Sequence, residues 1–281
     1  MTKDLIKKSH VEAALTQQHG KDAMLSSWSV EDFTEKCDNY TSGVYCIKVN
    51  YMKDGEKGNT SYVVKVNLNP GKEEHEKFYN HTFKKEGCFY FDVAPLLNTE
   101  LSLVGQVSLR IPKPFFINTE KGEEVFIMQD MRLDGFRQFG RTKSFDVPHT
   151  TLILKEFARL HGASMLLARR SPKESIISKF PDLADICALE DSASSIDELF
   201  SGLIAGCSEI AAKTEGYESL GPKIMRMCND SMKILSSFNS NPSKFEAIVH
   251  LDCYSANYIF KYVVKSINLL NTFNYCDILL F

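Results

Sequence analysis

The chain has 281 residues, of which 43% are hydrophobic and 25% charged, and its formal net charge is −3 at pH 7. This composition is typical of a globular protein with one or two cores, and it argues against a binder of nucleic acid or of anionic membranes. No apolar run approaches the roughly 18 residues of a membrane span, and the N-terminus lacks the apolar core of a secretory signal. The eight cysteines form no C-x-x-C pair, which argues against a zinc site. We therefore expect a cytoplasmic protein with reduced thiols and a small-molecule substrate, and no obligate protein partner is indicated.

The front of the chain begins with a helix signal and continues with strand signals. Apolar residues recur at helical spacing near the N-terminus and predict a leading helix over about residues 3–20. Residues 44–51 and 62–66 are rich in β-branched and aromatic side chains. The polar, glycine-containing stretch 53–59 between them predicts a strand–loop–strand hairpin.

A charged helix and a second pair of strands follow. Residues 73–90 predict a helix with Phe83 and Tyr90 on one face. Residues 109–117 and 125–131 predict two strands around a short glycine-containing turn. Two prolines in the first of these confine it to an edge or to an irregular strand.

After about residue 132 the strand signals largely stop and helical patterns replace them. Residues 150–168 predict a helix, with Leu154, Phe157 and other apolar side chains at helical spacing on one face. Residues 195–213 predict a second helix with an acidic first turn, and a third is expected from Gly221 to about Leu235. Mixed strands and helices before about residue 132, followed by mainly helices, predict an α+β protein.

The most informative segment comes late in the chain. A short apolar strand is expected over residues 245–249, and it runs into His250-Leu251-Asp252-Cys253-Tyr254-Ser255-Ala256-Asn257. In phosphoryl transfer one carboxylate accepts the proton of the attacking hydroxyl and one amide oxygen holds magnesium. Asp252 and Asn257 have the H-x-D-x-x-x-x-N spacing that kinase catalytic loops use for these roles. The alternative interpretation is an ordinary polar turn after a strand.

Three earlier features stand in the order that a kinase requires. Small and polar residues at 37–43 form a turn that can lay backbone N–H groups over phosphates, although an ordinary hairpin entry has the same composition. Lys65 lies in an apolar strand and Glu86 in the following helix, where the two can pair and hold nucleotide phosphates. Lys65 and Glu86 can each also be a solvated surface residue. The kinase prediction therefore depends on the order in which the turn, the lysine, the glutamate and the late loop occur along the chain.

These segments resemble the ecdysteroid-kinase-like family, which belongs to the choline-kinase and aminoglycoside-phosphotransferase type of protein-kinase-like folds. No single match is specific, but together they cover about residues 26–262. The matching segments are D-N-Y-T-S at 38–42, Y-V-V-K at 62–65, F-K-K-E with F-Y at 83–90, F-I-M-Q-D-M with G-F at 126–136, the helix at 154–164, and the loop and strand at 250–262.

The resemblance implies a bilobal fold, with an antiparallel-sheet N-lobe over residues 1–131 and a mainly helical C-lobe over residues 132–281. It implies an ATP- and Mg²⁺-dependent phosphotransferase acting on the hydroxyl of a small lipophilic molecule such as an ecdysteroid. Asp252 would be the catalytic base and Asn257 a magnesium ligand. The residues expected to bind the nucleotide are Asn39, Ser42, Lys65, Glu86, Gln129 and Met131.

The chain also departs from the family's pattern. Cys37 and Leu251 stand where the family has glycines. Cys37 restricts the backbone angles of the phosphate-binding turn. Leu251 narrows the side of the catalytic loop on which the acceptor would bind. No aspartate precedes Phe-Gln as a second magnesium ligand, and Asp277 is the candidate at about the right distance. We therefore expect an incomplete C-lobe with an atypical tail over residues 263–281. The alternative function is a catalytically inactive nucleotide-binding pseudokinase, or a non-functional fragment.

Overall fold

The computed structural model describes residues 2–33, 42–67, 73–140, 144–172, 174–184, 193–228, 247–250, 253, 255–263 and 274–280. The chain forms two compact units. The first comprises residues 1–68, 83–182 and 247–281, and the second comprises residues 69–82 and 183–246. This division differs from the lobe boundary expected near residue 131, which stays a prediction.

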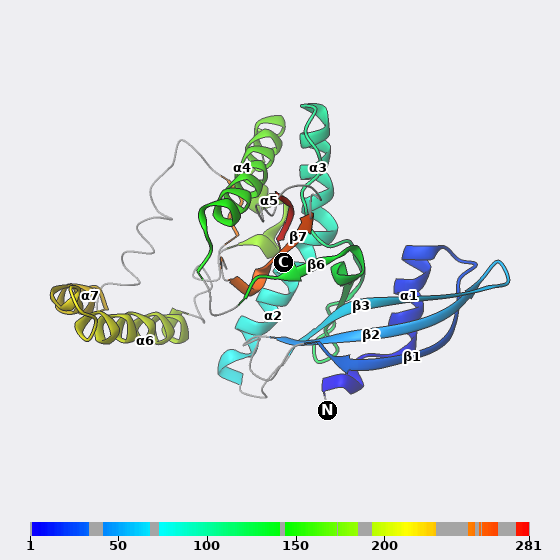
Figure 1. Cartoon of the computed structure of the whole chain (residues 1–281), viewed down its shortest axis with the longest axis horizontal. Helices are drawn as coiled ribbons and strands as arrows, with labels where there is room; N and C mark the ends of the chain where they lie inside the picture. The colour runs from blue at the N-terminus through cyan, green and yellow to red at the C-terminus, as the bar shows by residue number, and fades with distance from the viewer. Residues whose placement is uncertain are drawn as a thin grey trace, which may run out of the picture. The chain divides into compact units, whose positions relative to one another are not determined.

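Helices and strands alternate in the first part of the chain and helices dominate later, which confirms the predicted α+β class (Figure 1). Within the described ranges no helix is both long and apolar enough to cross a membrane. The elements are η1 (Thr2–Leu5), α1 (Lys8–His19), β1 (Met24–Asp32), β2 (Ser42–Lys53), β3 (Glu56–Asn67), α2 (Glu73–Cys88), η2 (Phe89–Val93), α3 (Ala94–Leu103), β4 (Pro114–Asn118), β5 (Val125–Gln129), η3 (Met131–Asp134), β6 (Phe136–Gln138), α4 (Val147–Arg170), α5 (Ile176–Lys179), η4 (Pro181–Leu183), α6 (Ala193–Ala212), η7 (Glu218–Leu220), α7 (Gly221–Cys228), η8 (Ser255–Asn257), β7 (Tyr258–Val263) and β8 (Asn274–Leu280).

The main sheet has five strands in the order β1-β2-β3-β5-β4, and every pair is antiparallel. The proline-containing strand β4 lies at the edge, as predicted. Strand β1 at the other edge was not predicted, and the reason is a bulge between Leu25 and Ser27. The bulge spaces the inward residues Leu25, Trp28 and Val30 unevenly, so the alternation that identifies a strand is lost.

The hairpin between β2 and β3 has a tighter turn than expected. Asp54 and Gly55 both have positive φ, 52° and 81°, and form the two-residue connection themselves. Most of the predicted loop at 53–59 is therefore strand. Gly58 lies within β3, where an added Cβ would come 2.4 Å from the ring of Tyr51.

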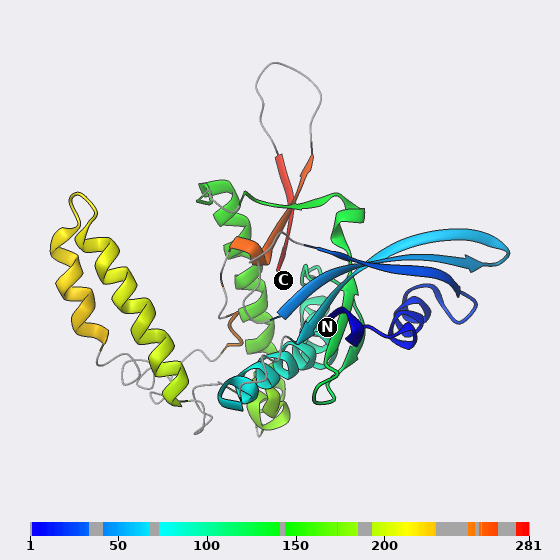
Figure 2. The same ribbon diagram turned by 90° about the horizontal axis from the view of Figure 1, so that it is seen from below.

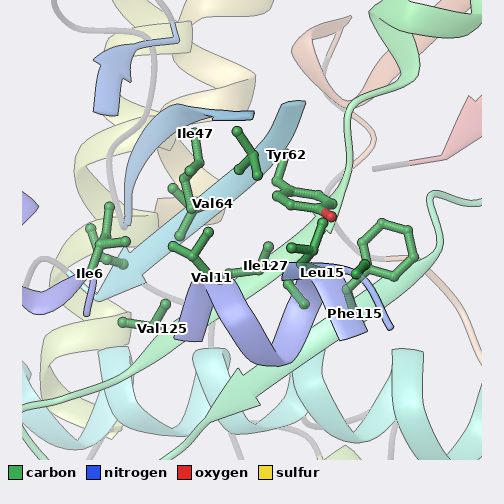
Figure 3. Close-up of a cluster of buried hydrophobic side chains, with 13 residues drawn as sticks. Ile6, Val11, Leu15, Ile47, Tyr62, Val64, Phe115, Val125 and Ile127 are labelled. Carbon is green, nitrogen blue, oxygen red and sulfur yellow. The ribbon is translucent and has the colours of Figure 1, made fainter. Parts of the chain in front are cut away.

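One face of the sheet packs against the leading helix. Figure 3 shows Val11 and Leu15 of α1 pointing into side chains from β2, β3 and β5. Tyr62 and Val64 of β3 belong to this cluster, and both are fully buried. Because side chains alternate along a strand, Val63 and Lys65, which alternate with them, belong to the opposite face.

The opposite face packs against the end of α2 and the π-helical turn η2. Phe83 and Tyr90 form a buried cluster there with Val63, Phe126 and Met128, as predicted for one helix face. The helical stretch continues through η2 and α3, well beyond the predicted end at residue 90.

The later part of the first unit contains a second sheet, with the order β6-β7-β8 (Figure 2). Helices predominate after residue 132, as predicted, but β6 and β8 were not predicted. β6 has only three residues, and its hydrogen-bond partner β7 lies more than a hundred residues later. No local sequence pattern therefore indicates β6. The strand expected at 245–249 is also absent from the described residues 247–249, which have no regular structure.

Helix α4 confirms the prediction for residues 150–168, but its buried face is a different one. Ile153, Leu160 and Ser164 are buried, whereas Leu154 of the predicted face is 59% exposed. Buried Glu156 is paired with Arg159, so this polar residue can lie inside the unit. Hydrophobic periodicity alone does not detect such satisfied polar positions.

The second unit contains the helix pair α6 and α7, close to the two predicted helices. The buried hydroxyl of Ser208 donates a 2.7 Å hydrogen bond to the carbonyl of Gly221 and fixes the start of α7 on α6. A Cβ on Gly221 would come 2.8 Å from Ala212, so the helices approach closely there. The expected continuation of α7 to Leu235 lies outside the described residues.

Candidate functional site

Lys65 and Glu86 form an ion pair on the face of the sheet opposite α1. The Nζ atom of Lys65 lies 2.5 Å from Oε1 of Glu86, and the two side chains are 16% and 26% exposed. Lys65 is the cross-strand neighbour of Val44 on β2 and of Phe126 on β5. The structure therefore brings together the two residues that the sequence predicted as a pair.

The packing of α2 explains why Glu86 reaches this lysine. Phe83 and Tyr90 bury their rings against the sheet, and Glu86 lies between them in sequence, one helical turn from each. Burial, together with the nearby charge of Glu86, raises the pKa of Tyr90 well above its usual value. Tyr90 is therefore a neutral packing residue.

A second polar cluster lies on the same face, where β5 ends. Asp130 is 1% exposed, and its carboxylate accepts hydrogen bonds from the Ser61 hydroxyl at 2.6 Å and from Arg132 Nε and Nη2 at 2.8 and 2.7 Å. Arg132 also donates to the Sγ atom of Cys46 at 3.0 Å. Residues of two strands, β2 and β3, are thereby joined to the segment that follows β5.

Asp130 is ionised in this setting. Burial opposes its charge, but hydrogen bonds from Arg132 and Ser61 outweigh burial and lower its pKa below the ordinary 3.8. Arg132 places its guanidinium carbon 4.2 Å from the centre of the Phe33 ring, next to the end of β1. The cluster therefore ties the segment after β5 to the far edge strand.

Gln129 and Met131, two of the residues expected to bind the nucleotide, make other contacts. The backbone N–H of Gln129 donates to the carbonyl of Lys113 at 2.9 Å, and its side-chain amide donates to Asp134 at 2.7 Å. Met131 is 8% exposed and packs with Phe136 and Ile259.

Two parts of the candidate catalytic loop are described, on either side of Asp252, which itself lies outside the described residues. Before it, the His250 ring lies 6.2 Å from the ring of Phe157 on α4. After it, η8 ends at Asn257, and the carbonyl of Ala256 accepts a 3.1 Å hydrogen bond from the Gln138 side chain. Asn257 is thus held at the entrance to β7.

The remaining predicted residues are placed only in part. Ser42 begins β2 opposite Asn67, while Asn39 lies outside the described residues. The backbone of Asp277 pairs with Lys261 inside β8, and its side chain is not among those described. Within the described part of the chain, no three acidic, histidine or cysteine side chains gather as a metal site.

Sequence reasoning passed over Asp130 and its partner Arg132. The alternation along β5 contains the missing signal, because Phe126, Met128 and Asp130 are two residues apart and share one face. Lys65 is the cross-strand neighbour of Phe126 and therefore lies on that same face.

One of the comparisons with known proteins found a match. A model of the ecdysteroid kinase-like family matches residues 36–272, which is well over half of the chain. No curated protein and no solved structure matched. The matched range includes the Lys65–Glu86 pair, the Asp130 segment, α4 and the loop from His250 to Asn257. The chain belongs to the ecdysteroid kinase-like family.

Proposed function

We propose that this protein transfers the γ-phosphoryl group of ATP to the hydroxyl of a small lipophilic molecule such as an ecdysteroid. The observation that carries the proposal is the Lys65–Glu86 ion pair, in a chain of a kinase-like family. The segment 129–132 would join a nucleotide-binding lobe over residues 1–131 to a helical acceptor lobe over residues 132–281.

On the nucleotide side, Lys65 would donate hydrogen bonds to phosphate oxygens. Glu86 holds the ammonium group in place before the nucleotide arrives, so less ordering is needed on binding. Val63 and Phe126 reduce access of water on this face, which strengthens an interaction between lysine and phosphate. Ser42 and Asn39 would contribute from the turn before β2, and Gln129 and Met131 from the segment after β5.

On the acceptor side, Asp252 would accept the proton of the attacking hydroxyl. Asn257 would hold Mg²⁺ through its amide oxygen, the kind of hard oxygen ligand that this ion prefers. The hydrogen bond from Gln138 to Ala256 fits this role, because it fixes the turn that ends at Asn257. When bound, Mg²⁺ neutralises phosphate charge during transfer.

We place this activity in the cytoplasm. The four cysteines whose side chains are described, Cys46, Cys88, Cys207 and Cys253, form no disulfide, as expected for a reducing compartment. The net charge of −3 favours neither nucleic acid nor an anionic membrane as a partner.

One observation favours a second candidate, a nucleotide-binding protein without transfer activity. The backbone of Asp277 pairs with Lys261 in the middle of β8. In kinases the second magnesium ligand begins the D-F-G segment. If Asp277 does not supply this ligand, charge compensation on the phosphates weakens and transfer slows.

Thermal shift measurements test the nucleotide site. ATP should raise the melting temperature of the wild type, and the rise should grow with Mg²⁺ because the ion binds together with the phosphates. Lys65→Met should remove most of the rise. An equal rise for both proteins would contradict the assignment of Lys65.

A further inference from the structure

Ser164, in the interior of α4, forms a hydrogen bond to a residue outside its own helix. Ser164 is fully buried, and its hydroxyl donates to the carbonyl of His161 at 2.8 Å. The same oxygen accepts a 3.0 Å hydrogen bond from the backbone N–H of Ile248. Serine stabilises the interior of a helix less than alanine does. Ser164 therefore lowers the stability of α4 unless its hydrogen bond with Ile248 compensates. That bond joins residues 84 positions apart in the chain.

The face of α4 that carries Ser164 also contacts the rest of the candidate loop. The ring of Phe157 lies 6.2 Å from that of His250 and 6.3 Å from that of Tyr258. Ile248 and His250 precede Asp252, and Tyr258 directly follows Asn257. One helix therefore anchors the chain on both sides of the residues proposed to carry the chemistry.

We propose that Ser164 is a positioning residue for phosphoryl transfer. Its hydroxyl fixes the backbone at Ile248, four residues before Asp252, and so determines where the loop begins. This inference rests on the proposed function, because it concerns the placement of the proposed base. Proton transfer is sensitive to placement, and a displacement of about 1 Å can reduce a rate about a hundredfold.

Loss of this hydroxyl should affect turnover rather than nucleotide binding. In Ser164→Ala the Ile248 N–H loses its acceptor, and the start of the loop is released. Lys65 and Glu86 are on other elements and keep their ion pair. We therefore expect kcat to fall about 10- to 100-fold, while KM for ATP changes less than about twofold.

Hydrogen–deuterium exchange measures the positioning without requiring activity. In Ser164→Ala the amide of Ile248 should exchange about tenfold faster than in the wild type, the effect of losing about one hydrogen bond. Ser164→Thr retains a hydroxyl and should restore slow exchange. The matched control is Thr151→Ala on the same helix, because the Thr151 hydroxyl is exposed and donates to Val147 within α4. Unchanged exchange in Ser164→Ala would overturn the proposal.

The activity assay uses Mg·ATP with ecdysone as acceptor. Reduced kcat in Ser164→Ala, with recovery in Ser164→Thr, supports positioning, whereas altered exchange with unchanged kcat overturns it. If Ser164→Ala does not fold, Ser164→Cys replaces it, because a thiol of similar size is a poor acceptor. A wild type that binds no Mg·ATP contradicts the proposed function, and the exchange result then decides separately whether Ser164 holds Ile248.

Discussion

Replacing Glu86 with glutamine should separate the role of the Lys65–Glu86 pair in stability from its role with the nucleotide. The two side chains are 16% and 26% exposed, and their charged atoms lie 2.5 Å apart. At an effective dielectric constant of about 20, two unit charges at this separation attract by about 6 to 7 kcal/mol. Hydration of the released lysine offsets part of this attraction, and the glutamine amide still accepts a hydrogen bond. We therefore expect a stability loss of about 1 to 2 kcal/mol.

The effect on the nucleotide should be larger than this loss suggests. Without the charge of Glu86, Lys65 can adopt other rotamers and is no longer held for the phosphates. We expect the Mg·ATP thermal shift to shrink and kcat/KM to fall about 10- to 100-fold. The stability loss is measured by urea unfolding, and the nucleotide effect by thermal shift and initial rates.

The chain offers a matched control for this substitution. Glu100 on α3 is 5% exposed and forms an ion pair with Arg170 at 2.5 Å. Glu100→Gln makes the same chemical change and should reduce stability, but it should leave the response to Mg·ATP as in the wild type. An equal loss of the nucleotide response in both variants, or a full response in Glu86→Gln, would contradict the role of Glu86 in holding Lys65.

Three further predictions concern the described structure. Asp130→Asn should cost about 1 to 2 kcal/mol in urea unfolding at pH 7, since Arg132 is 45% exposed and partly rehydrates. The folded pKa of Asp130 lies below 3.8, so the stability difference between the wild type and Asp130→Asn should be at its full size above about pH 4. It should shrink as the pH falls through the folded pKa. A difference that does not change with pH would contradict an ionised Asp130. Gly55→Ala should lower the free energy of unfolding by about 1 kcal/mol, because φ at Gly55 is 81°. Thermal unfolding measures this loss, and no loss would argue against the two-residue turn. Alkylation followed by mass spectrometry should modify exposed Cys207 and Cys253 well before Cys46, whose burial raises its thiol pKa, and early labelling of Cys46 would contradict its burial.

The elements that the sequence predicted well are those with a strong local period. The alternation along β3 and the helical spacing of Phe83 and Tyr90 were enough to place Lys65 and Glu86 facing each other. The order of these residues before H-x-D-x-x-x-x-N also identified the family.

The elements that were missed depend on distant partners or on satisfied polar groups. β6 has three residues and forms only because it pairs with β7, far along the chain. Ser164 and Asp130 are buried because hydrogen bonds satisfy them, and hydrophobic periodicity assigns such residues to the surface. The roles of Asp252 and Asn39 remain predictions, because both lie outside the described residues.

The most direct test of the proposed kinase activity is phosphoryl transfer itself. The purified chain would be incubated with γ-labelled ATP, Mg²⁺ and a panel of hydroxylated steroids that includes ecdysone, alongside Asp252→Asn. We predict a labelled steroid product that requires Mg²⁺ and is lost in Asp252→Asn, while that variant still shows the Mg·ATP thermal shift. Intact Mg·ATP binding by the wild type, with no labelled product from any acceptor, would contradict the kinase assignment and favour a nucleotide-binding protein without transfer activity.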